Sequence, residues 1–213
     1  MRTKTLLLTA VLGVAGIASS MAQVFSVNAV GYVNVVVPAN LSMIANPLDT
    51  GANTLGNLIP NPPNFSNFYK FNGTGFDIAT FAFGSWDLPN LTLNPGEGGF
   101  LNTSTSFTNT FVGTVMQGTL ANPIPAGLSI RSSQVPQSGA IDTVLGLTTL
   151  STFDNVYKWN VTAQSYDIYT VLPGGGWSGP NGGTTAPSLN VAEPVFINAG
   201  AAISWNRTFS VNN

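Results

Sequence analysis

The chain of 213 residues carries a net charge of −2 at neutral pH, and charged side chains occupy only 7% of its positions. This balance excludes the basic surface that nucleic-acid binding needs, so no nucleic-acid partner is expected. The absence of cysteine and histidine excludes disulfides, thiol nucleophiles, Ser-His-Asp triads and the usual zinc sites. Hydrophobic residues make up 44% of the chain, which suffices for a folded core. We therefore expect a folded protein without a cofactor or a metal.

The start of the chain predicts a secretory signal peptide over residues 1–22. Arg2 and Lys4 precede an apolar run that ends at Ala18, and Ser20-Met21-Ala22 offers the small residues that a signal peptidase reads. The run is too short for a membrane span, and no later apolar run approaches the roughly 20 residues that a span needs. We expect a secreted protein, located outside the cell, at the cell surface or in the periplasm.

One aromatic motif occurs twice. The copies are Tyr69-Lys70-Phe71-Asn72 with Phe76-Asp77-Ile78, and Tyr157-Lys158-Trp159-Asn160 with Tyr166-Asp167-Ile168. Each copy predicts a β-hairpin, two short strands around a polar turn. The hairpin pairing places Lys70 opposite Asp77 and Lys158 opposite Asp167, and we expect a cross-strand ion pair in each. The alternative is a Lys–Asp pair that grips a ligand. The pairing also predicts equivalent buried sites for Phe71 and Trp159.

Other segments recur in the same order. Pro38-Ala39-Asn40-Leu41-Ser42 matches Pro125-Ala126-Gly127-Leu128-Ser129, and Leu93-Asn94-Pro95-Gly96-Glu97 matches Leu189-Asn190-Val191-Ala192-Glu193. Ordered matches of this kind indicate a duplication. We expect one β repeat over residues 23–115 and a second over 116–213, with the junction near residues 116–124. Because residues 111–115 resemble 30–33, one strand there is expected to end the first repeat and begin the second.

Short strands between turn clusters predict the fold class. We expect an all-β protein of two tandem β-sandwich or barrel-like repeats with short helical turns. Asn53 and Asp142 are the expected capping residues of these turns, and Val144 is expected to face the core.

The motifs above also carry a resemblance. The opening Val24-Phe25-Ser26-Val27-Asn28-Ala29-Val30-Gly31-Tyr32, the Tyr-Lys-aromatic-Asn hairpin and Leu93-Asn94-Pro95-Gly96-Glu97-Gly98 resemble a set of uncharacterised secreted tandem-repeat β proteins of Verrucomicrobia and related bacteria. The resemblance covers nearly all of the chain after residue 22. It implies a secreted β protein and brings no established activity.

The search for chemistry leaves few candidates. Trp86 and Trp177 lie in glycine-rich loops, where indoles either stack on sugar rings or cap the core beneath. The recurring carboxylates Asp77 with Glu97, and Asp167 with Glu193, have the composition of a glycosidase pair, yet two such sites in so small a protein are unusual. The simpler role for each glutamate is a turn carboxylate that accepts backbone N–H groups. We expect a protein that is not an enzyme.

The two ends of the mature chain are similar. Phe25 and Val27 begin it, and Phe209 and Val211 end it. These terminal strands are candidates for pairing with a neighbouring copy, which would build rings or filaments. The alternative is that they lie in the chain's own sheets.

Together these observations predict a secreted, non-enzymatic structural or surface-associated protein. We expect it to act through contacts with other protein subunits or cell-surface components, self-assembly included. The alternative is a carbohydrate-binding module that uses its loop tryptophans to bind polysaccharide.

Overall fold

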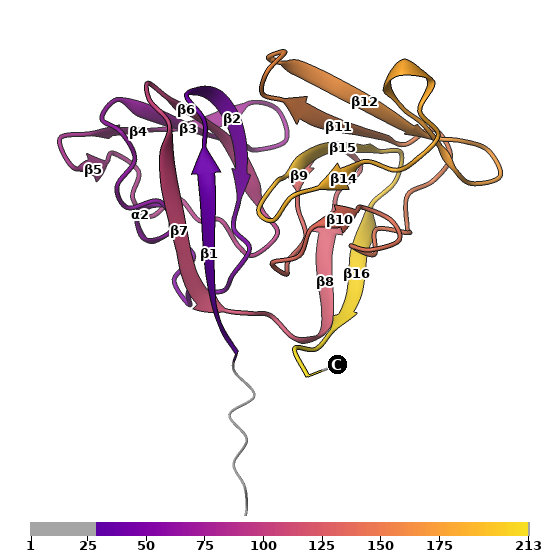
Figure 1. The fold of residues 1–213 in the computed structure, drawn as a ribbon, viewed down its shortest axis with the longest axis horizontal. Helices are drawn as coiled ribbons and strands as arrows, with labels where there is room; N and C mark the ends of the chain where they lie inside the picture. The colour runs from indigo at the N-terminus through magenta and orange to yellow at the C-terminus, as the bar shows by residue number, and fades with distance from the viewer. Residues whose placement is uncertain (1–28, 213) are drawn as a thin grey trace, which may run out of the picture.

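A computed structural model describes residues 29–212 (Figure 1). The predicted signal peptide, Phe25 and Val27 lie outside the described residues. The described chain folds almost entirely into antiparallel strands with one short α-helix and one 3₁₀ turn, which confirms the all-β class.

The first half combines a five-stranded sheet with a two-stranded ribbon. Its elements are β1 (Val30–Val37), β2 (Asn40–Ala45), α2 (Leu55–Leu58), β3 (Ser66–Phe71), β4 (Phe76–Ala82), β5 (Ser85–Trp86), β6 (Gly98–Thr103) and β7 (Phe107–Thr114). The sheet has the order β2-β6-β3-β4-β5, and β1 pairs with β7. The first and last strands of this half therefore form the ribbon.

The second half has the same topology. Its elements are β8 (Gly118–Ile124), β9 (Gly127–Arg131), β10 (Gly139–Ala140), β11 (Asn155–Asn160), β12 (Ser165–Val171), β13 (Trp177–Ser178), η1 (Pro180–Gly182), β14 (Ser188–Leu189), β15 (Val195–Ala199) and β16 (Ile203–Phe209). The sheet order is β9-β15-β11-β12-β13, the ribbon is β8-β16, and β10 pairs with β14. The strand β8 begins at Gly118, within the expected junction over residues 116–124. The strand expected at residues 111–115 to end one repeat and begin the next belongs to β7, which pairs with β1 of the first half, whereas β8 pairs with β16.

In each half the ribbon covers one face of the sheet. In the first half Val37 and Phe111 of the ribbon are buried in one cluster with Phe68 and Leu101 of the sheet. In the second half Ile124 and Trp205 of the ribbon share a cluster with Val156 and Ile197 of the sheet. Alternation along the strands puts every second side chain into these cores, so each half is a small sandwich.

The short helical turns exist, but their details differ from the sequence prediction. Thr54, not Asn53, precedes α2, and it forms no side-chain cap. Asn53 adopts a positive φ of 49°, and its side chain bonds to those of Asn46 and Asp49. Val144 is half exposed where a core position was expected. A residue in the left-handed region cannot act as an extended N-cap, which explains the first difference.

The two halves pack through the opposite faces of their sheets, near the centre of Figure 1. Phe100, Ile130 and Phe196 are buried there in a third cluster. The backbone bonds across this interface are reciprocal: Ala45 N donates to Ala192 O at 2.9 Å, and Ser132 N donates to Gly96 O at 2.8 Å. The halves therefore meet through equivalent elements, as in a two-fold symmetric dimer.

Candidate functional site: paired aromatic grooves

The site is built from the hairpins that the sequence indicated. The observed register pairs Phe71 with Phe76 and Lys70 with Asp77 in β3-β4, and the equivalent pairs recur in β11-β12. This confirms the predicted register. Since side chains alternate across a strand, the aromatic members of each hairpin face away from the core of their own half. They point instead toward the other half.

The aromatic contacts between the halves are crossed. Phe71 of the first half lies 5.3 Å from Phe196 of the second, between ring centroids. Trp159 of the second half lies 5.3 Å from Phe100 of the first. Trp159 Nε1 also donates to Leu41 O at 3.0 Å. Phe71 and Trp159 do occupy equivalent positions, but they are half-buried between the halves rather than buried in the two cores.

This packing leaves two grooves. The first groove, about 550 Å³, is lined by Leu41, Tyr69, Phe76, Phe100, Asn102, Trp159 and Tyr166. The second groove, about 450 Å³, is lined by Leu128, Tyr157, Tyr166, Phe196, Asn198, Phe71 and Phe76. Each groove takes most of its lining from one sheet and a hairpin aromatic pair from the other half.

The linings match position by position. Strand pairing makes Tyr69, Phe100 and Asn102 equivalent to Tyr157, Phe196 and Asn198. Phe76 and Tyr166, themselves equivalent, line both grooves. The two grooves are thus symmetric copies that meet at a shared aromatic pair.

The polar groups of the grooves are not used in internal bonds. Within residues 29–212, the amides of Asn102 and Asn198 and the hydroxyls of Tyr69, Tyr157 and Tyr166 form no hydrogen bond to another side chain or to the backbone. Burial raises the pKa of Tyr166 to about 12, so its hydroxyl keeps its proton at neutral pH. Both grooves are lined without a charged residue. They offer aromatic surface with free amide and hydroxyl groups.

The loop tryptophans lie elsewhere. Trp86 and Trp177 are 4% and 7% exposed. Trp86 Nε1 donates to Ile59 O at 2.7 Å, and Trp177 Nε1 donates to Asp142 Oδ2 at 3.0 Å. The proposal that they stack on sugars is therefore wrong, and the core-capping alternative describes them. The groove residue Trp159 was missed because its side chain was assigned to a core.

The lysines pair with the glutamates rather than with the aspartates. Lys70 Nζ lies 3.3 Å from Glu97, and Lys158 Nζ lies 3.3 Å from Glu193. The expected Lys–Asp ion pairs were wrong in their partner, although the register was right. Asp77 accepts a bond from Asn72 and Asp167 accepts one from Asn160 within the hairpins.

Both glutamates also have the expected turn role. Glu97 accepts the Asn94 N–H at 2.9 Å and Glu193 accepts the Asn190 N–H at 2.8 Å. Each carboxylate of the suspected glycosidase pairs thus has a structural partner. No cluster of metal-ligating side chains occurs in the described part of the chain.

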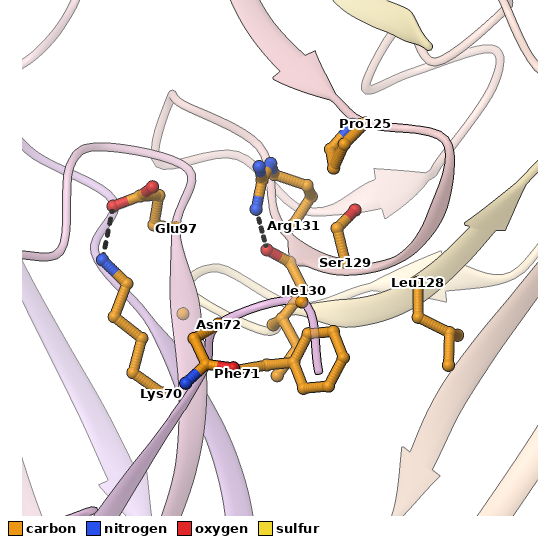
Figure 2. A pocket seen from close by; sticks show the side chains of 11 residues that line it. Lys70, Phe71, Asn72, Glu97, Pro125, Leu128, Ser129, Ile130 and Arg131 are labelled. Carbon is orange, nitrogen blue, oxygen red and sulfur yellow. Dashed lines mark hydrogen bonds and ion pairs between the residues drawn. The ribbon is translucent and has the colours of Figure 1, made fainter. Parts of the chain in front are cut away.

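A charged pocket of about 210 Å³ adjoins the second groove (Figure 2). Its polar lining comes from Lys70, Asn72 and Glu97 of the first half and from Ser129 and Arg131 of β9. Phe71 and Leu128 line both this pocket and the second groove. The pocket and the groove are therefore neighbours that share two wall residues.

The C-terminal strand pairs within its own chain. Phe209 ends β16 opposite Gly118 of β8. Val211 lies beyond the strand, where its N–H donates to Gln117 Oε1 at 3.1 Å. The C-terminal strand therefore lies in one of the chain's own sheets, as the alternative prediction states.

The comparisons with known proteins give no further guidance. No family model, curated protein or solved structure matches this chain. The resemblance stated from the sequence motifs stays a prediction. Within residues 29–212, no helix combines the length and apolar character needed to cross a membrane.

Proposed function

We propose that this is a secreted, non-enzymatic protein that binds carbohydrate in its paired aromatic grooves. The observation that carries the proposal is the repetition of one lining, aromatic rings with free amide and hydroxyl groups, on both sides of the interface. Binding sites for small molecules combine apolar walls with a few polar groups that fix orientation.

The chemistry of the grooves favours sugars over other ligands. Aromatic rings present flat apolar surface, and the free amides of Asn102 and Asn198 can donate and accept hydrogen bonds. A sugar ring offers the complementary pattern of C–H faces and hydroxyl edges. The absence of charged lining residues disfavours a ligand whose main recognition is ionic.

A glycan array followed by calorimetric titration tests the proposal. Asn102→Ala and Asn198→Ala should each weaken the binding of an array hit about fivefold, since one hydrogen bond contributes about 1 kcal/mol. Asn206→Ala is the matched control, because Asn206 is an exposed asparagine on the ribbon of the second half, outside both grooves. A protein that binds no glycan, or binding that both groove variants leave intact, would overturn the proposal.

A second candidate function, self-association as a structural protein, rests on a different surface. The outward face of β1-β7 exposes Val30, Tyr32 and Val36, at 76%, 69% and 69%, next to the half-exposed Val112. Contiguous exposed apolar residues mark interaction sites. The matching face of β8-β16 carries polar residues such as Thr119 and Asn206 instead.

Light scattering across concentration tests this candidate. Val36→Lys should lower the average mass of the protein if copies associate through the β1-β7 face. Thr119→Lys places the same charge on the polar face of β8-β16 and should leave the mass unchanged. A protein that stays monomeric at every concentration tested contradicts self-association.

A further inference from the structure

The charged pocket beside the second groove holds a concentration of charge that is unusual for this chain. Lys70, Glu97 and Arg131 line one cavity, although charged residues are only 7% of the sequence. Lys70 and Glu97 form an ion pair at 3.3 Å, so their charges compensate each other. The guanidinium of Arg131 leaves the pocket with a net positive charge.

Arg131 has hydrogen-bonding capacity to spare. Its Nη1 donates to Ile130 O at 2.8 Å (Figure 2). Its Nε donates to Pro123 O at 2.7 Å, and together the two bonds fix the orientation of the guanidinium. Its Nη2 forms no hydrogen bond within residues 29–212 and keeps some contact with solvent. Burial lowers the pKa of Arg131, and the negative charge of Glu97 offsets part of this effect. A partly desolvated guanidinium with a free N–H group gains from an incoming anion.

Ser129, close to Arg131 on β9, holds a buried hydroxyl without a partner in the described part of the chain. The residue is 4% exposed, and its Oγ has no hydrogen-bond partner among the described residues. Buried hydroxyl groups without a partner are rare in folded proteins and require an explanation. Ser129 and Arg131 are two residues apart on β9, so their side chains emerge on the same face of the strand.

The other half of the molecule provides an internal comparison. The matching pocket, about 260 Å³, contains Ser42 and Glu193 at the equivalent positions. Strand pairing places Ile44 where the charged pocket has Arg131. Ser42 Oγ donates to Leu101 O at 3.3 Å and is therefore satisfied. The cation and the free hydroxyl occur together in one half only.

We propose that the charged pocket binds the carboxylate of an acidic sugar, a uronic acid, whose ring lies in the adjoining second groove. The Arg131 Nη2 would donate to a carboxylate oxygen. Phe71 and Leu128, which line both cavities, connect the carboxylate site to the ring site. This inference rests on the proposed carbohydrate binding and adds that the ligand is acidic at one end.

The test compares uronic acids with neutral sugars. We would titrate glucuronate, galacturonate, glucose, galactose and acetate into the mature protein and follow the Arg131 Nε–H signal by NMR. The uronates should bind about tenfold more tightly than the neutral sugars, which corresponds to about 1.4 kcal/mol, and more tightly than acetate. The preference should weaken as salt is added, because the pocket is open to solvent.

Variants assign the preference to the pocket. Arg131→Ile introduces the residue that the first half has at the equivalent position, Ile44. This variant should lose the preference for uronates and keep its affinity for neutral sugars. Ser129→Ala and Ser42→Ala, which each remove a buried hydroxyl, are controls and should leave the preference unchanged. If Arg131→Ile does not fold, Arg131→Lys keeps the charge but loses the planar fork, and it should still lower the preference.

The outcomes separate this inference from the proposed function. Equal affinities for uronates and neutral sugars overturn the inference and leave carbohydrate binding intact. Acetate that binds as tightly as the uronates also overturns it, because the pocket would then recognise a carboxylate without a sugar. If the protein binds uronates in a manner that depends on Arg131 but binds no neutral glycan, the result supports the carboxylate site in the charged pocket. It also shows that the grooves do not bind neutral sugars.

Discussion

Gly96 is the residue whose substitution tests the packing of the two halves most sharply. It has a φ of +86°, and a Cβ built there would lie 2.4 Å from Asn122 Nδ2 and 3.1 Å from Ser132 O. Gly84 has the same φ of +86°, and a Cβ there would meet nothing within 4 Å. The two glycines therefore share the cost of a left-handed alanine and differ only in their surroundings. Gly84→Ala is the matched control for Gly96→Ala.

The expected difference follows from the contacts. A left-handed alanine costs about 1–2 kcal/mol at either position. At Gly96 the new methyl group must also displace the buried Asn122 amide, which donates to Gly96 O at 3.2 Å and to Ser132 O at 3.1 Å. Losing these bonds and leaving a buried amide without partners costs about 2–3 kcal/mol more. We expect Gly96→Ala to lower the free energy of unfolding by about 3–5 kcal/mol in all.

Urea unfolding of the mature protein measures both changes. The midpoint of Gly96→Ala should fall well below that of Gly84→Ala. A smaller m-value or a second transition in Gly96→Ala would show that the halves unfold separately once their contact is broken. Equal losses of stability in the two variants would refute the reasoning, because Gly96 would then lie in open surroundings.

Three further predictions concern residues of the two hairpins. Lys70→Met and Lys158→Met should each lower stability by about 1 kcal/mol or less, measured by urea unfolding, since both ion pairs are partly exposed. A larger loss would contradict the small contribution expected of partly exposed pairs. Tyr166, with its pKa raised to about 12 from the ordinary value near 10, should titrate late in an absorbance experiment. The contribution of protonated Tyr166 to the free energy of unfolding is complete below pH about 10 and is lost as the pH rises toward 12. Tyr166→Phe should therefore make stability less sensitive to pH in that window. An unchanged pH dependence would contradict this. Phe71→Ala and Trp159→Ala should each cost about 1–3 kcal/mol, less than a fully buried aromatic would, because both rings are half-buried; silent variants in thermal melts would contradict the crossed packing.

Local pattern was enough to predict much of the fold. The polar turn and the alternating aromatic residues predict the hairpin register, because a slip by one residue would move every side chain to the other face of the sheet. The structure has this register, with Lys70 opposite Asp77. The ordered motif matches likewise predicted the strands of both halves. These features depend on neighbours along the chain, which a sequence displays directly.

The candidate site depends on contacts between distant segments, and the sequence did not reveal it. The aromatic residues of the hairpins were assigned to a core because nothing local shows that a second sheet covers them. Glu97 reaches Lys70 only through the pairing of β6 with β3, so the ion-pair partner was misjudged. The substitution of Arg131 for Ile44 between the repeats was visible in the sequence, and it was the available signal for the charged pocket.

The most direct test of the account is an NMR titration that uses the four tryptophan indoles as reporters. Trp159 lies at the first groove, whereas Trp86, Trp177 and Trp205 are buried in the cores of the two halves. Adding a glycan that binds should shift the Trp159 indole N–H signal and leave the other indole signals in place. Shifts at Trp86 or Trp177 with Trp159 unmoved, or no shift with any glycan, would contradict carbohydrate binding in the paired grooves.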